Sequence, residues 1–167
     1  MNTHFAVASH LLVAIEATRR RLGEKPMPTA ALSWSVQTHK VFVLRVIKKL
    51  EEVGLVETVR GPKGGIVMTR PGSEITLADV YEATREDENI YKIHSTNDRC
   101  QIGNNVIDAL ANVQKELDNL IIQRLSVTTI SELTDQTLAI SEEKLAHGAF
   151  YTNFRIDPDN TLEPPQQ

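Results

Sequence analysis

The sequence contains a single cysteine, Cys100, and few aromatic residues, which make up 5% of its 167 residues. One cysteine excludes an internal disulfide and suits a reducing compartment, so we expect a cytoplasmic protein. No apolar run approaches the roughly 20 residues that a membrane span needs. The apolar N-terminus follows no basic region and precedes no small-residue cleavage site, which argues against a secretory signal. We therefore expect a soluble protein with no membrane partner.

The net charge of −4 hides an uneven distribution of charged residues. Residues 1–72 contain 11 Lys and Arg against 5 Asp and Glu, a balance of +6, whereas residues 73–167 contain 7 against 17, a balance of −10. A basic N-terminal part can meet phosphates while an acidic remainder is repelled by them. Charges that only decorate a soluble protein would give the same asymmetry, so this observation alone leaves nucleic-acid binding open.

Three helices are predicted in the first 54 residues from apolar residues at helical spacing. Asn or Thr marks the start of the first and second helices, and a glycine marks the end of the first and third. The cluster Arg19–Arg21 lies near the end of the first helix, where the helix dipole favours cations. The expected elements are a helix from Asn2 or Thr3 to Gly23, a loop over Lys25–Pro28, a helix over Ala30–Ser35 capped by Thr29, a Gln37-Thr38 link, and a helix from about His39 to Val53 followed by Gly54 as its C′ residue.

The third helix has the pattern of a recognition helix. One face carries apolar residues at positions i, i+3, i+4 and i+7, which predicts a stripe buried against the first two helices. The opposite face is mainly basic. Two short helices with a tight link indicate a helix-turn-helix, although many helical proteins contain such pairs with a merely solvated basic face. The buried stripe is Val43, Val46, Ile47 and Leu50, and the opposite face holds His39, Phe42, Arg45, Lys48 and Lys49.

A β-hairpin is predicted directly after this helix. Leu55–Arg60 and Ile66–Thr69 read as strands, and the glycines and proline between them supply the backbone angles of a sharp reversal. Arg60, Lys63 and Arg70 would project from it, where a wing can reach a minor groove or phosphates. An ordinary surface hairpin without a DNA contact would have the same sequence pattern. A Walker-type phosphate loop is excluded, because its Gly-Lys is followed by Ser or Thr at the start of a helix.

These segments together resemble the Rrf2 family of bacterial winged helix-turn-helix repressors, which includes regulators that sense iron-sulfur clusters and nitric oxide. The resemblance covers roughly residues 1 to 140 and is specific in combination. It rests on Met1–Ala8, on Val59–Pro62 with Gly64-Gly65, on Ile75–Val80, and on Arg99–Asn105, which is similar to a CPxGxN-like segment of the family. It implies base contacts by His39, Phe42, Leu44 and Arg45 and a minor-groove contact by Arg60. Leu44 is apolar where many members have a polar or charged residue.

The predicted DNA-binding residues divide by role. Arg45 can donate to guanine or phosphate, and His39 can contact a base edge or phosphate. The lysines suit phosphate contacts, which fix the register of the protein on DNA without reading sequence. The full set is Thr38, His39, Lys40, Phe42, Leu44, Arg45, Lys48, Lys49, Arg60 and Lys63.

The second half of the chain predicts a dimerisation helix. Apolar residues repeat there with spacing 4, 3, 4, 3, the a/d pattern of helix pairing. A helix of about 22 residues spans about 33 Å, more than a small winged domain can cover, so we expect a partner helix from a second subunit. A single long helix on its own domain is the alternative. The repeating residues are Val106, Leu110, Val113, Leu117 and Leu120, and Ile107, Ile121 and Leu125 widen the stripe.

Two capping boxes are expected on either side of this helix. Thr76 with Asp79 opens a helix over Leu77–Thr84, which an acidic irregular stretch, Arg85–Asp98, follows. Thr129 with Glu132 opens a short helix that ends at about Ile140.

Cys100 allows several interpretations. Cluster-binding members of the family carry three cysteines in this segment, because thiolates hold such clusters. With one cysteine, even with His94 and Asp98 as further ligands, we expect no metal and no cofactor. A redox switch would need an exposed thiol of lowered pKa, which Arg99 would favour; a plain buried cysteine is the alternative. Catalysis would need a base beside Cys100, and only His94 is close in sequence, so no enzyme and no catalytic residue is expected.

We therefore predict a mainly α protein with a small β-hairpin, in which a winged helix-turn-helix domain is followed by a long dimerisation helix. The expected division is a DNA-binding domain at 1–85, a sensor loop and dimerisation helices at 86–140, and a tail at 141–167 with aromatic residues Phe150, Tyr151 and Phe154 and a disordered end.

The predicted function is sequence-specific DNA-binding transcription regulation, as a homodimeric repressor on a palindromic operator. Its partners would be double-stranded DNA and a second copy of the chain, and the sequence does not identify its small-molecule or redox signal. One alternative is a winged-helix module for protein interaction without specific DNA binding. The other is a redox-sensing regulator that depends on Cys100.

Overall fold

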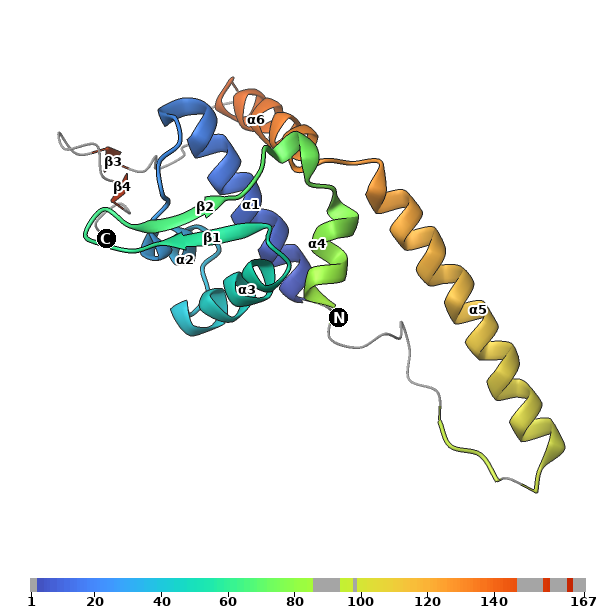
Figure 1. Ribbon diagram of the computed structural model, residues 1–167. Helices are drawn as coiled ribbons and strands as arrows, with labels where there is room; N and C mark the ends of the chain where they lie inside the picture. The colour runs from blue at the N-terminus through green and yellow to red at the C-terminus, as the bar shows by residue number, and fades with distance from the viewer. Residues whose placement is uncertain (1–2, 86–93, 98, 147–154, 157–161, 164–167) are drawn as a thin grey trace.

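The computed structural model describes residues 3–85, 94–97, 99–146, 155–156 and 162–163. It confirms the expected fold class, mainly α with a small β-hairpin (Figure 1). Predictions for Asn2, Asp98, residues 86–93 and the aromatic residues of the tail lie outside the described residues. The elements are α1 (Thr3–Leu22), α2 (Thr29–Ser35), α3 (Lys40–Glu52), β1 (Val56–Val59), β2 (Gly65–Met68), the 3-10 turn η1 (Gly72–Glu74), α4 (Leu77–Thr84), α5 (Gln101–Ser126), α6 (Ile130–Ala146), β3 (Arg155–Ile156) and β4 (Leu162–Glu163).

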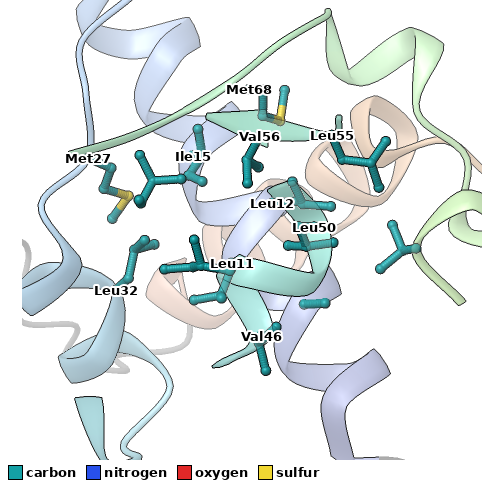
Figure 2. Close-up of a cluster of buried hydrophobic side chains, with 14 of the residues drawn as sticks. Leu11, Leu12, Ile15, Met27, Leu32, Val46, Leu50, Leu55, Val56 and Met68 are labelled. Atoms are coloured by element: carbon teal, nitrogen blue, oxygen red, sulfur yellow. The ribbon is translucent and has the colours of Figure 1, made fainter. Parts of the chain in front are cut away.

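The hydrophobic core lies between α1, α3 and the β1–β2 hairpin, with α2 at one side (Figure 2). The predicted stripe of α3 is confirmed, because all four of its side chains are buried in this core. The side chains that meet there include Leu11, Leu12 and Ile15 of α1, Leu32 of α2, Val46 and Leu50 of α3, Val56 of β1 and Met68 of β2.

The start of α2 differs from the prediction. Thr29 is the first helical residue, and Pro28 is the N-cap, with its carbonyl oxygen accepting from the Leu32 N–H at 3.1 Å. Proline suits a helix start because its fixed φ is already compatible with that position and its missing N–H would have no helical partner. The predicted link to α3 is confirmed, since Gln37 turns the chain with a φ of 48°.

The end of α3 brings the hairpin back along the helix. Gly54 has a φ of 69° and donates its N–H to the Glu51 carbonyl, while the Leu55 N–H donates to the Leu50 carbonyl at 2.9 Å. These two bonds form a Schellman motif, the helix end that a C′ glycine favours. Because β1 then runs back along α3, the turn of the hairpin returns toward the N-terminal end of the helix (Figure 1).

The hairpin is antiparallel and pairs Val56 with Met68 at one end and Val59 with Gly65 at the other. The loop expected over Lys25–Pro28 is wrong in part: Met27 pairs with Ile66 through two hydrogen bonds of 2.9 Å and is buried in the core. This pairing explains Gly65, where a Cβ atom would lie 2.4 Å from the Met27 carbonyl oxygen. The hairpin is thereby fixed to the segment before α2.

Both predicted capping boxes are confirmed. Thr76 accepts from the Asp79 N–H at 3.2 Å and donates its own N–H to that carboxylate, and Thr129 and Glu132 repeat the arrangement. The two capped segments also pair, because the Ile130 N–H donates to the Ile75 carbonyl at 2.8 Å. This pairing brings α6 back to the N-terminal domain, where it packs against α1 (Figure 1).

The two C-terminal helices are longer than predicted. α5 has 26 residues and starts immediately after Cys100, whose Sγ accepts from the Gly103 N–H at 3.4 Å. Its 26 residues span about 39 Å at 1.5 Å per residue. α6 continues past Ile140 to Ala146, and no glycine or proline interrupts the sequence in between. Capping by the sulfur atom and the absence of helix breakers account for both differences.

An ion-pair network joins α1 to α6. Glu16 is only 1% exposed and accepts from Arg19 at 2.9 and 3.0 Å and from Arg20 at 2.8 Å. Arg20 also donates to the Ser131 carbonyl and hydroxyl oxygens and pairs with Asp135, both on α6. Two arginines of the basic N-terminal part are therefore bound to carboxylates of the protein itself. This reduces the number of cations that are available to contact DNA.

The charge state of Glu16 follows from this network. Burial alone would raise the pKa of its carboxyl group, but hydrogen bonds and the positive charges of Arg19 and Arg20 outweigh burial and lower the pKa below its ordinary value. Glu16 is thus held as a carboxylate in the folded protein.

Candidate DNA interface

The N-terminal end of α3 and the turn of the hairpin lie at the same end of the domain, toward the left in Figure 1. His39 is the N-cap of α3 and has no side-chain capping bond, so the first N–H groups of the helix receive no bond from that side chain. A helix N-terminus carries a partial positive charge and favours phosphate. This end of the domain therefore offers backbone donors as well as side-chain cations.

Four of the predicted basic residues are available for external contacts. Lys40, Arg45, Arg60 and Lys63 are exposed, and none has an ion-pair partner among the described residues. Lys48 is also exposed, and its Nζ lies 3.9 Å from a Glu52 carboxylate oxygen, a contact that costs little to exchange for a phosphate. These cations come from both α3 and the hairpin, the two elements that a winged domain presents to DNA.

Other predicted site residues are less exposed to solvent or are paired within the protein. Phe42 is half-buried, and its ring packs against His4 with centroids 4.8 Å apart. Thr38 and Lys49 are also half-buried. Arg70, expected to project from the hairpin, instead pairs with Asp79 of the α4 capping box at 3.7 Å.

One exposed apolar residue of α3 is absent from the predicted site. Val41 is 71% exposed, beside Leu44, which is 45% exposed. The sequence-based prediction favoured basic and polar positions and therefore omitted Val41, although the spacing of the helix indicates that Val41 is exposed. Val41 precedes the buried Val43 by two positions, about 200° around a helix, so it must point away from the core. An apolar residue there has no internal contact to explain it.

The long helix α5 meets the rest of the chain along one side only. Among its described side chains only Gln114 is buried, while Ile107, Ile121 and Leu125 are half-buried, and Asp118 lies 3.9 Å from Arg85. The predicted a/d residues Val106, Leu110, Val113, Leu117 and Leu120 are all exposed. Figure 1 shows α5 extending away from the winged domain, so most of its length faces solvent.

Cys100 is exposed, which makes the alternative of a plain buried cysteine wrong. Its sulfur caps α5, as described above. Within residues 3–85, 94–97 and 99–146, no group of three or more His, Cys, Asp or Glu side chains is placed to hold a metal ion. In the same part of the chain, no helix has the length and apolar character of a membrane-crossing segment.

The arrangement of α2, α3 and the hairpin defines a winged helix-turn-helix protein. A family model named Rrf2, described as an iron-dependent transcriptional regulator, matches residues 1–136, and the chain belongs to this family. The resemblance seen in the sequence is thereby confirmed. Rrf2 proteins are DNA-binding transcription regulators rather than enzymes, as expected from the sequence.

Individual proteins and solved structures are also similar to this chain. Protein aau3 of Rhizobium meliloti is 37% identical over 84 residues, a match that covers 50% of this chain and 51% of aau3. The HTH-type transcriptional regulator IscR of Vibrio cholerae is 26% identical over 160 residues, which cover 95% of this chain and 88% of IscR. The structure of CymR, the global cysteine regulator of Bacillus subtilis, superposes with a TM-score of 0.56 at 17% identity, over 81% of this chain and 96% of CymR. This last likeness concerns the fold alone.

Proposed function

We propose that this protein is a transcription repressor that binds a palindromic operator as a homodimer. The observation that carries the proposal is the group of exposed, unpaired cations at one end of the winged domain, contributed by α3 and by the hairpin together. With Arg19 and Arg20 held by Glu16, the cations that remain for external contact are concentrated on these two elements. A surface of this kind suits the phosphates and grooves of duplex DNA.

In this proposal α3 enters the major groove with its N-terminal end foremost. Arg45 donates to guanine or phosphate, and His39 contacts a base edge or phosphate. Arg60 on the hairpin enters the adjacent minor groove, whose negative potential attracts arginine. Phosphate contacts, which carry no sequence information, come from Lys40, Lys48, Lys49 and Lys63.

The homodimer is supported by the exposed face of α5. Val106, Val113, Leu117 and Leu120 form an apolar stripe at a/d spacing that the described part of the chain leaves open to solvent. A second copy of α5 would bury this stripe by knobs-into-holes contacts. Two-fold symmetry would then place two recognition helices on successive half-sites, which is why we propose a palindromic operator. Repression would follow from occupation of promoter DNA.

Selection of bound sequences from random duplex DNA with the full chain tests the proposal. We expect an enriched motif with two-fold symmetry, weaker binding by Arg45→Ala and Arg60→Ala, and unchanged binding by Lys115→Ala, an exposed lysine of α5 that lies outside the a/d stripe. Recovery of no enriched sequence would refute the proposal and favour a winged-helix module for protein interaction. An enriched motif without symmetry would refute the palindromic operator.

The exposure of Cys100 favours a second candidate, a regulator whose DNA binding responds to thiol oxidation. In this case, mild oxidation should change the DNA affinity of the wild-type protein and leave that of Cys100→Ser unchanged. Serine is also a good N-cap, so the variant should keep α5 intact. Equal affinities of reduced and oxidised wild-type protein would exclude this redox control.

A further inference from the structure

Val41 and Leu44 form an apolar pair on the exposed side of α3. They are 71% and 45% exposed and are three positions apart, so their side chains lie on the same side of the helix. The opposite face of α3 already packs into the core through the buried stripe of the helix. Valine is also a weaker helix former than the charged residues common at such positions. Neither side chain is therefore explained by the stability of the domain.

The surroundings of this pair indicate its partner. Lys40 precedes Val41 and Arg45 follows Leu44, and both cations are exposed without an ion-pair partner among the described residues. An apolar centre with a cationic rim complements a surface that is apolar at its floor and anionic at its edges. The major groove is such a surface where it contains thymine, because the thymine 5-methyl group lies on its floor between phosphate backbones.

The position of the pair within α3 fits this partner. Val41 is the second residue of the helix and Leu44 the fifth, and recognition helices contact base edges through their N-terminal residues. Three residues advance a helix by about 4.5 Å, close to the roughly 3.4 Å between base pairs. The two side chains can therefore reach the same or neighbouring base pairs.

We propose that Val41 and Leu44 select thymine in each half-site of the operator through contact with its 5-methyl group. The inference rests on the proposed DNA binding and adds the base that α3 recognises by apolar contact. Val41 and Leu44 supply no hydrogen bond to a base edge. The specificity at these positions comes from burying a methyl group that cytosine, adenine and guanine lack at that place.

Replacing thymine by deoxyuridine tests this directly, because it removes only the methyl group. Each thymine of the selected operator is replaced in turn, in both half-sites, and binding of the full-length protein is measured by fluorescence anisotropy at fixed salt. For wild-type protein we expect about a fourfold loss of affinity per contacted methyl, the equivalent of burying one such group. The loss should occur at one or two neighbouring positions of the half-site.

Protein variants assign the effect to side chains. Val41→Ser and Leu44→Ser should bind thymine and deoxyuridine operators alike at the position that each contacts. Both residues are exposed, so the variants should keep the thermal stability of the wild type. Val53→Ser, a 54% exposed valine at the far end of α3, is the matched control and should keep the full sensitivity to deoxyuridine.

Each contrary result has a separate meaning. Wild-type protein that binds the operator with no deoxyuridine effect overturns the thymine inference and leaves the DNA-binding function intact. A deoxyuridine effect that persists in both serine variants also overturns it, since the methyl group would then act through DNA shape or another residue. Absence of any specific DNA binding overturns the proposed function itself.

Discussion

The ion-pair network around Glu16 makes a strong prediction for stability. Glu16→Gln keeps the size of the side chain and removes its charge, leaving Arg19 and Arg20 beside a neutral group. The Glu16 carboxylate is buried and accepts three hydrogen bonds of 2.8 to 3.0 Å from these arginines. Removing one partner of a buried pair typically costs 3–5 kcal/mol. Because both arginine side chains are about 30% exposed, water replaces part of the loss, and we expect a cost of about 3 kcal/mol.

The loss should depend on pH in a defined direction. The folded state holds the pKa of Glu16 below its ordinary value of 4.5, so the network stabilises the protein above that pH. This stabilisation is lost as the pH falls through the folded pKa. The wild type and Glu16→Gln should therefore differ most at neutral pH and converge in acid below about pH 4.5.

Thermal unfolding of both proteins at one concentration measures the effect. For a chain of this size, about 3 kcal/mol corresponds to a fall in Tm of about 6–12 °C at neutral pH. Glu24→Gln is the matched control: Glu24 also binds Arg19, but its side chain is 73% exposed, and the loss should stay below about 1 kcal/mol. Equal losses in the two variants, or a difference that grows in acid, would refute this account of the network.

Two further substitutions test the dimer and the hairpin. Leu120→Glu, at a 59% exposed position of α5, should weaken self-association at least about a hundredfold in sedimentation experiments, since burying an unpaired charge costs several kcal/mol. The control Val53→Glu, away from α5, should leave self-association unchanged. A Leu120→Glu dimer as stable as that of the wild type would contradict the proposed interface. Gly65→Ala would bring a Cβ within 2.4 Å of the Met27 carbonyl oxygen and should lower the free energy of unfolding in denaturant by about 1–3 kcal/mol. An unchanged free energy of unfolding would mean that the Met27 segment moves aside easily.

Local sequence patterns predicted the features that local interactions determine. The buried stripe of α3 and both threonine capping boxes depend on residues within one or two turns, and their spacing is visible in the sequence. The Gly54 helix end is of the same kind. So is the reversal at Gly61, whose φ of 117° requires glycine.

Contacts between distant segments were beyond such patterns. Met27 pairs with β2 although the residues around it read as a loop, and Arg20 binds α6 residues more than 100 positions away. The i, i+3 and i, i+4 spacing of Glu16 to Arg19 and Arg20 was a signal for their pairing, but only the fold buries the carboxylate. As a result, the sequence overstated the number of N-terminal cations free to meet phosphates.

The central claim is that the exposed cations of α3 and the hairpin bind duplex DNA. The most direct test is the affinity of the full chain for its selected operator over a range of salt concentrations, for wild type and Lys63→Ala. We predict that log affinity falls linearly with log salt and that the slope becomes shallower by about 0.9 when the phosphate contact of Lys63 is removed. Binding that does not respond to salt, or a Lys63→Ala variant with unchanged slope and affinity, would contradict the claim.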